Sequence, residues 1–281
     1  IRLELLTDYD MHMMIESGIR GGISMIAHRY AKANNKYLPD YDESKENSYI
    51  TYLDANNLYG WAMIQELPYK NFQWSDERNI ETLITKYGAG TVKRGCFVKV
   101  DLEYPEELHD AHNDYPLAPE RKLVSQDMLS PYAKGLQTKL NIGDDTCEKL
   151  VPNLQDKFGY VADIRNIAYY IQKGLKVTKV HQVITFDQDT WLAPYINFNT
   201  SKRAKAQNDF EKDFFKLMNN AVFGKTMENL RNRVDINFVT TNECWGNKAT
   251  KKMSTVEKKI ASPLYSGHII YSESLTAIKM K

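Results

Sequence analysis

The chain has 281 residues, of which 42% are hydrophobic and 26% are charged, and its formal net charge at pH 7 is +1. This composition excludes a disordered chain and suffices for more than one structural unit. No apolar run reaches the roughly 20 residues that a membrane span needs, and no signal-peptide pattern opens the chain, so we expect an intracellular protein without a membrane partner.

The net charge conceals an asymmetry along the chain. Residues 201–281 hold 15 Lys and Arg against 8 Asp and Glu and carry +7, whereas the first 200 residues carry −6. A basic segment is where a polyanion would bind. The cysteines, Cys96, Cys147 and Cys244, are far apart and lack metal-binding spacing, which indicates a reducing compartment rather than a disulfide framework.

Residues 3–16 are compatible with a helix, after which Gly18-Ile19-Arg20-Gly21-Gly22 predicts a break in regular structure. Three glycines around an arginine let backbone amides approach a phosphate or another chain, although the same residues suit an ordinary flexible turn. Because the chain begins at Ile1 rather than Met and ends without a polar tail, we expect a fragment of a longer protein.

Asp54 follows the run Tyr49-Ile50-Thr51-Tyr52-Leu53, whose β-branched and aromatic side chains predict a buried strand. A carboxylate at the end of such a strand is costly without a cation, which makes Asp54 a candidate metal ligand. The alternative is that Asp54 and the two asparagines after Ala55 cap a helix over residues 58–63.

Further strands are predicted downstream. Residues 95–103 alternate apolar and polar side chains, which predicts a half-buried strand in the same sheet as residues 49–53. Residues 105–160 contain five prolines among polar turns and are expected to form an insertion packed on the main body. Residues 160–163 and 177–186 then predict strands that flank a helix over residues 164–174, so the chain is mixed α and β.

The clearest helical periodicity covers residues 201–220, with Thr200 or Ser201 as the N-cap. Its apolar stripe consists of Phe210, Phe214, Leu217, Met218, Ala221 and Val222, and the opposite side carries Lys202, Lys205, Lys212, Lys216, Asn220 and Phe223. The large aromatic residues are typical of a core, and interspersed acids argue against a membrane-surface helix. A cationic face that ends in an amide and an aromatic ring favours binding of phosphates and a base over a solvated basic face.

Two segments resemble motifs of the family B DNA polymerases. Asp54-Ala55-Asn56-Asn57-Leu58-Tyr59-Gly60 resembles the first palm motif, Asp-x-x-Ser-Leu-Tyr-Pro, and Lys216-Leu217-Met218-Asn219-Asn220-Ala221-Val222-Phe223-Gly224 resembles the fingers motif, Lys-x-x-x-Asn-Ser-x-Tyr-Gly. The order of the motifs, their separation of 162 residues and the upstream Arg20-Gly21-Gly22 turn resemble the protein-primed branch found in viruses, linear plasmids and large transposons. The resemblance covers the whole chain.

The resemblance implies an α+β fold, in which a polymerase palm with an antiparallel sheet and helices carries a helical fingers hairpin and an inserted subdomain. The implied segments are a link from an upstream exonuclease portion (1–30), the first part of the palm (31–104), an insertion resembling the first terminal-protein region (105–160), palm-associated strands and a helix (161–187), the fingers (188–232), and the truncated start of a second insertion or of the palm (233–281).

The implied activity is template-directed transfer of a nucleotide from a dNTP to a primer or protein hydroxyl, with two Mg²⁺ ions as cofactors. By resemblance, Asp54 and the Ala55 carbonyl would bind metal. The Leu58 and Tyr59 amides would lie near the triphosphate, and the Tyr59 ring would exclude a ribose 2′-hydroxyl. The implied partners are a DNA template-primer, a dNTP and a terminal priming protein.

The fingers motif implies further contacts. Lys216 would contact the triphosphate, and Asn220 and Phe223 would face the nascent base pair. A second cation belongs near the start of this helix, and periodicity favours Lys202 or Lys205 whereas the family's spacing points between Arg203 and Lys205, so all three stay open. DNA contacts are implied for Arg20, Gly21, Gly22, Gly224 and Lys225.

The sequence departs from the family pattern at several positions. Gly60 replaces the usual Pro, Asn57 and Ala221 replace the two Ser positions, Phe223 replaces Tyr, and Ile19 stands where the upstream link has Tyr. No Asp-x-Asp motif follows Gly224, so we expect this chain to lack the second catalytic carboxylate pair and to be inactive by itself.

Two alternatives compete with an active polymerase. The first is a nucleic-acid-binding polymerase remnant without activity. The second is a metal-dependent phosphohydrolase, because the run from His109 to Asp114 places two His and two Asp, with His109 and His112 as the ligands, within six residues. The His-x-x-His spacing, bracketed by Pro105 and Pro116 into a loop, favours a polar turn over that metal site.

Overall fold

The computed structural model describes residues 2–28, 30–89, 93–143, 147–240, 255–272 and 275–281. The chain forms two compact units, Ile1–Met227 and Glu228–Lys281. Both units combine α-helices with antiparallel sheets, so the predicted α+β class is confirmed. Cys244 lies outside the described residues.

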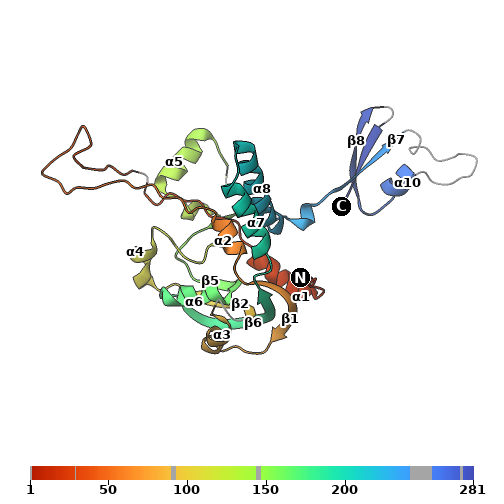
Figure 1. The fold of residues 1–281 in the computed structure, drawn as a ribbon, viewed down its shortest axis with the longest axis horizontal. Coiled ribbons are helices and arrows are strands. Elements are labelled where there is room, and N and C mark those ends of the chain that lie inside the picture. Colours follow the sequence, from red (N-terminus) through yellow and green to blue (C-terminus); the bar gives the residue numbers. More distant parts are fainter. Residues whose placement is uncertain (1, 29, 90–92, 144–146, 241–254, 273–274) are drawn as a thin grey trace, which may run out of the picture. The chain divides into compact units, whose positions relative to one another are not determined.

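The first unit is built on a four-stranded sheet with the order β1-β6-β2-β5 (Figure 1). Its strands are β1 (Leu67–Ser75), β2 (Arg94–Glu103), β5 (Lys157–Asp163) and β6 (Lys176–Asp189), and every neighbouring pair is antiparallel. The register places Val98 of β2 opposite Val183 on one side and Ala162 on the other. The strands predicted over 95–103, 160–163 and 177–186 are thereby confirmed, as is the helix between the last two, α6 (Ile164–Gln172).

The two faces of this sheet follow from the alternation of side chains along β2. Cys96, Val98, Val100 and Leu102 face one core, which also contains residues of α3 (Ile80–Tyr87) and α6. Phe97 points to the other face, where α1 (Tyr9–Gly18) contributes buried methionines. Each fully buried aliphatic side chain stabilises this layered arrangement by about 1.5–3 kcal/mol.

Helix α1 begins later than predicted. Asp8 is its N-cap, and the Asp8 carboxylate accepts a hydrogen bond from the Met11 amide at 3.0 Å. The prediction of a helix from residue 3 is wrong, because the preceding segment instead hydrogen-bonds the sheet, with the Glu4 amide donating to the Tyr69 carbonyl of β1 at 2.9 Å.

The buried strand predicted at residues 49–53 is wrong. These residues have no regular structure, and Tyr49, Ile50, Tyr52 and Leu53 are 62%, 65%, 91% and 85% exposed. A strand needs a hydrogen-bonded neighbour whatever its side chains prefer. Within the described residues the nearest pairing is an isolated bridge between Asn34 and Ser48, so this segment does not join the sheet of β2.

The segment predicted as one helix over residues 201–220 is instead a hairpin of two helices, α7 (Ala193–Ala204) and α8 (Asp209–Thr226). Figure 1 shows them side by side. Asn208 separates them, because its side chain accepts a hydrogen bond from the Glu211 amide at 2.9 Å and so caps α8. The prediction of a single cationic face is therefore wrong, because Lys202 lies on α7 and Lys205 follows the end of that helix. The predicted core stripe is wrong at its start, since the Phe210 and Phe214 side chains are 79% and 45% exposed.

Residues between β2 and β5 form a separate substructure. It comprises short helical turns at Glu106–Leu108 and Gln126–Met128, α4 (His109–His112), β3 (Glu120–Leu123), α5 (Pro131–Leu140) and β4 (Glu148–Val151). Strands β3 and β4 pair only with each other among the described residues, in an antiparallel sheet. Lys157, at the start of β5, joins this substructure to the main sheet, since its buried ammonium donates to the Asn153 side chain at 2.6 Å and to the Gln155 carbonyl.

The second unit contains a short helical turn (Leu230–Asn232), β7 (Asp235–Thr240), α10 (Thr255–Ile260), β8 (Tyr265–Ser272) and β9 (Leu275–Met280). Its antiparallel strands have the order β7-β9-β8, and Val239, Ala277 and Ile278 are the buried hydrophobic residues among those described in this unit. In the described parts of the chain, no helix combines the length and the apolar character that crossing a membrane requires.

Candidate functional site

The two predicted motifs meet at one pocket of about 360 Å³ in the first unit. It is lined by Asp54, Ala55, Asn56, Asn57, Leu58, Tyr59, Arg203, Lys216 and Asn220. These residues come from three separate segments, namely the stretch that leads into α2 (Leu58–Met63), helix α7 and helix α8. The fold therefore brings side chains that are 162 residues apart in the sequence to the same cavity.

The segment from residue 54 to residue 59 presents its polar groups to this pocket. Asn57 adopts a left-handed conformation, with φ 55° and ψ 40°, and its carbonyl accepts the Trp61 amide at 2.9 Å. The alternative in which Asp54 and the asparagines cap this helix is wrong, because the Asn57 side chain makes no capping bond and no described residue hydrogen-bonds the Asp54 carboxylate. Asp54 is exposed and its oxygens are available to a cation.

The glycine in place of the family's proline has a local reason. A Cβ on Gly60 would lie 2.3 Å from Nδ2 of Asn57, so a larger residue at this position requires the Asn57 side chain to move. Gly60 thus leaves room for the side chain of Asn57, the left-handed residue that precedes α2.

Two cations reach the pocket from the helical hairpin. Arg203 comes from α7 and Lys216 from α8, both are exposed, and neither forms an ion pair with an acid in the described residues. Of the three alternatives left open by the sequence, Arg203 is the residue that lines the pocket. Lys202 instead lies 5.6 Å from the Phe198 ring centroid, and Lys205 follows the end of α7. The pocket therefore combines one carboxylate with two cations, a set that suits a polyphosphate bound with a divalent metal.

An aromatic pair forms one edge of the site. Tyr59 stacks on Phe223 of α8 with ring centroids 4.1 Å apart and planes inclined by 21°. A Cβ on Gly22 would lie 3.6 Å from the Tyr59 hydroxyl, which brings the upstream glycine turn close to this ring. The predicted roles of Tyr59, Asn220 and Phe223 stay predictions, but all three lie in or beside the pocket.

Arg20 holds the glycine turn to β5. Its guanidinium donates to the carbonyls of Val161 at 2.7 Å and Gly18 at 3.1 Å and lies 3.9 Å from the Tyr160 ring centroid. Burial raises the pKa of the Tyr160 hydroxyl, which keeps that ring neutral. Gly21 and Gly22 are exposed, and the DNA contacts predicted for this turn remain a prediction.

The other residues with predicted DNA contacts lie in the last turns of α8. Gly224 and Lys225 do not line the pocket that contains Asp54. Lys225 borders a separate, open and mostly apolar hollow with Tyr195, Met218, Ala221, Val222 and Thr226.

The two histidines of the phosphohydrolase alternative interact with Tyr104. The Tyr104 hydroxyl is 2.8 Å from Nδ1 of His112, and Nε2 of His109 is 3.3 Å from the Tyr104 carbonyl. The loop expected here is wrong, because His109–His112 form the short helix α4. Across the described ranges, no group of three or more His, Cys, Asp or Glu side chains is arranged to hold a metal.

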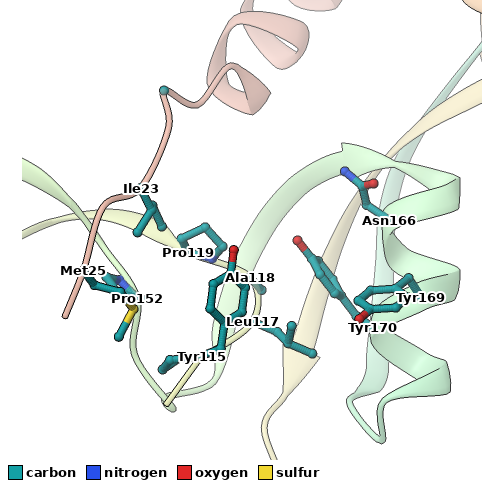
Figure 2. A pocket seen from close by; sticks show the side chains of 12 residues that line it. Ile23, Met25, Tyr115, Leu117, Ala118, Pro119, Pro152, Asn166, Tyr169 and Tyr170 are labelled. Atoms are coloured by element: carbon teal, nitrogen blue, oxygen red, sulfur yellow. The ribbon is translucent and has the colours of Figure 1, made fainter. Parts of the chain in front are cut away.

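A second pocket, of about 370 Å³, has a different chemical character (Figure 2). Tyr115, Tyr169 and Tyr170 contribute rings to it, and the remaining lining comes from Gly21, Ile23, Met25, residues 116–119, Pro152 and Asn166. No charged side chain is among its described lining residues. The groups that suit a metal and phosphates therefore gather at Asp54 and not here.

Sequence reasoning missed several features of the site. Asn56 and Asn57 line the pocket, a position that their adjacency to Asp54 could have signalled. The approach of Gly22 to Tyr59 carries no sequence signal, since it depends on how distant segments pack.

Comparison with known proteins finds a family and a solved structure that are similar to this chain. The family model described as DNA polymerase type B, organellar and viral, matches residues 7–281. Among solved structures, phi29 DNA polymerase in an orthorhombic crystal form matches with 13% sequence identity and a TM-score of 0.42 over 81% of this chain. The match covers 33% of that polymerase chain, and a search of curated proteins finds no match. The chain belongs to the organellar and viral type B DNA polymerases.

Proposed function

We propose that the pocket containing Asp54 binds the incoming deoxynucleoside triphosphate in template-directed DNA synthesis. The observation that carries this proposal is that one carboxylate, two cations and three side-chain amides from distant segments line a single cavity. A solvated basic helix has no need of such convergence, whereas cations and a metal-binding carboxylate recur where a triphosphate is bound with Mg²⁺.

The cations would hold the triphosphate. Arg203 and Lys216 approach from different helices, so together they can contact phosphate oxygens from two sides. By resemblance, the Leu58 and Tyr59 amides would bind the same group from the palm side. Binding of this kind fixes the position of the phosphorus atom at which the primer hydroxyl attacks.

The aromatic pair would hold the sugar and the base. The Tyr59 ring lies at the edge of the pocket and is kept there by its stack on Phe223. In the resembling family this ring excludes a ribose 2′-hydroxyl, so Tyr59 would select deoxynucleotides. Asn220, one turn from Lys216 on α8, would face the nascent base pair.

Asp54 and the Ala55 carbonyl would supply oxygen ligands to Mg²⁺. Their chemistry fits, because Mg²⁺ prefers oxygen and usually keeps waters and phosphate oxygens among its six ligands. When bound, paired Mg²⁺ ions activate the primer hydroxyl and neutralise the triphosphate charge. Asp54 is the carboxylate among the described lining residues, so we propose that this chain binds dNTP but needs further carboxylates for catalysis.

The partners follow from this role. A DNA template-primer is the required second substrate of the proposed reaction. A terminal priming protein remains a proposal that rests on the resemblance of residues 105–160 to a terminal-protein region.

The test separates binding from catalysis. Binding of dATP with Mg²⁺ to the 281-residue chain is measured by calorimetry, and primer extension is measured in a longer protein that contains this sequence. Asp54→Ala is expected to weaken Mg²⁺-dependent dATP binding and to abolish extension. Asp213→Ala is the control, since it removes an exposed carboxylate of α8 that does not line the pocket. Full extension by the Asp54→Ala protein would overturn the assignment.

A further inference from the structure

The helical hairpin that carries both pocket cations is joined at its centre by two buried asparagines. Asn199 of α7 is 2% exposed and Asn219 of α8 is 3% exposed. Asn219 is the buried residue of α8, whereas the large apolar residues Phe210 and Leu217 of that helix are 79% and 63% exposed. An amide pair is therefore buried between the helices where an apolar stripe would be expected.

The amides form a chain of hydrogen bonds that crosses from one helix to the other. Asn199 Nδ2 donates to Asn219 Oδ1 at 3.0 Å, and Asn219 Nδ2 donates to the Thr200 hydroxyl at 3.3 Å. The Thr200 hydroxyl in turn donates to the Ile196 carbonyl at 2.8 Å. The two amide donors reach these acceptors only when the helices are aligned as they are here, whereas the Thr200 bond lies within α7.

The pair lies close to the pocket along both helices. Arg203 follows Asn199 by four residues, which is one turn of α7. Lys216 precedes Asn219 by three residues and Phe223 follows it by four, so the three share one side of α8. Any sliding of the helices past each other would change the separation of the Arg203 and Lys216 side chains.

We infer that Asn199 and Asn219 are positioning residues, which set the register of α7 against α8 and thereby the spacing of the Arg203 and Lys216 cations. Apolar contacts between helices tolerate sliding, but a buried amide that loses its partner is destabilised, so the pair accepts one alignment. The functional consequence rests on the proposed binding of a nucleoside triphosphate.

Two leucine variants separate register from stability. Asn219→Leu leaves the Asn199 amide buried without its partner and is expected to lower the melting temperature. The double variant Asn199→Leu with Asn219→Leu replaces the whole pair by apolar groups, a change that is often neutral or stabilising. We expect the double variant to regain the melting temperature but to bind dATP with Mg²⁺ on the order of tenfold more weakly, because the cations are no longer held in place.

The register itself is measured without any nucleotide. Spin labels on cysteines placed at the exposed positions Asn197 and Asp213 report the distance between the helices by electron resonance. Cys147 and Cys244 are replaced by Ser, whereas Cys96 can stay because burial raises its thiol pKa to about 12. The double leucine variant is expected to broaden or split the distance distribution.

Tyr195→Phe is the matched control. It removes another contact between the helices, the bond from the Tyr195 hydroxyl to the Met218 carbonyl at 3.3 Å, on an exposed side of the hairpin. We expect it to change neither the distance distribution nor dATP binding.

The outcomes distinguish this inference from the proposed function. A double leucine variant with an unchanged distance distribution overturns the role in register, whatever the chain binds. An unchanged affinity for dATP despite a broadened distribution overturns the link from register to the cations. If the unaltered chain binds no dATP, the proposed function fails, and the distance measurement still decides whether the amides set the register.

Discussion

Tyr59 and Phe223 lie ring against ring, with centroids 4.1 Å apart, at the point where α2 meets α8. Stacking of this kind contributes about 0.5–1.5 kcal/mol beyond the area buried. Because Tyr59 also lines the pocket, the stack determines where its ring stands relative to Arg203 and Lys216. The pocket edge is therefore shared between two segments of the chain.

The first prediction concerns the choice between deoxynucleotides and ribonucleotides. Tyr59→Val shortens the side chain at the pocket edge and is expected to lower the preference for dATP over ATP by about tenfold or more. The ratio of the two dissociation constants measures this. Tyr52→Val is the control, since Tyr52 is 91% exposed and does not line the pocket. Unchanged discrimination in the Tyr59 variant would rule out its steric role.

The second prediction tests which cation binds the triphosphate. Arg203→Ala and Lys216→Ala are each expected to weaken dATP binding by about tenfold or more, because charge-assisted hydrogen bonds to phosphate are lost. Lys202→Ala and Lys205→Ala remove the same charge outside the pocket and should have little effect at physiological salt. A larger loss with Lys202 or Lys205 than with Arg203 would contradict the geometry.

The third prediction is a pH dependence of stability. The Lys157 side chain is 1% exposed, and burial lowers its pKa from 10.5 to about 8, although Glu120 opposes this from 3.8 Å. Between pH 8 and 10.5 the unfolded chain holds more protons than the folded one, so this group makes the folded state more stable as the pH rises through that window. The full effect is on the order of 3 kcal/mol.

Lys157→Met is expected to remove this part of the pH dependence, measured by denaturant unfolding at pH 8 and pH 10. Lys176→Met is the control, because Lys176 is an exposed lysine whose ion pair with Glu103 raises its pKa, so it stays charged across the window. If the unfolding free energy changes equally with pH in the wild type and in the Lys157 variant, the buried ammonium is not the source of the pH dependence.

The fourth prediction compares two glycines. A Cβ on Gly95 of β2 would lie 2.5 Å from Oε1 of Gln188 and 2.6 Å from Cε2 of Phe186, so Gly95→Ala overpacks the sheet and is expected to cost about 1–3 kcal/mol of unfolding free energy. Gly135 lies inside α5, where a Cβ would meet no atom within 4 Å, and Gly135→Ala is expected to stabilise by about 0.5–1 kcal/mol. Denaturant unfolding of both variants measures the change in unfolding free energy, which should be negative for Gly95→Ala and positive for Gly135→Ala.

The central sheet could be predicted because its strands carry their own signal. In β2 the buried side chains of Cys96, Val98 and Val100 recur at every second residue, which matches the two-residue period of a strand. In β6 the buried run from Val183 to Phe186 marks a strand covered on both faces. Local pattern and tertiary burial agree in these elements.

Two of the wrong predictions, a strand at residues 49–53 and one helix over residues 201–220, also have physical causes. The residues from Tyr49 to Leu53 have strand-forming side chains, but strand formation also depends on a neighbour that no window of sequence reveals. The hairpin of α7 and α8 was hidden because helical periodicity runs through Asn208, whose capping bond to Glu211 ends one helix and starts the next.

The site was predicted in part, as a set of residue types in two motifs. The sequence could not decide among Lys202, Arg203 and Lys205, because a helix face assigned by periodicity fails once the helix is broken. It also gave no indication of the pair formed by Asn199 and Asn219, since two asparagines on different helices have no spacing to recognise.

Strand β6 lies inside the sheet, hydrogen-bonded to β1 on one side and β2 on the other, and it ends at Asp189, four residues before α7 begins at Ala193. The hairpin that carries Arg203 and Lys216 is thus rooted in a strand that is anchored along both edges. The short connection from Thr190 to Leu192 joins strand and hairpin, and both helices also contact α2, where Phe223 of α8 stacks on Tyr59. The two cations are therefore held from two directions, by a strand bonded along both edges and by the aromatic contact at α2.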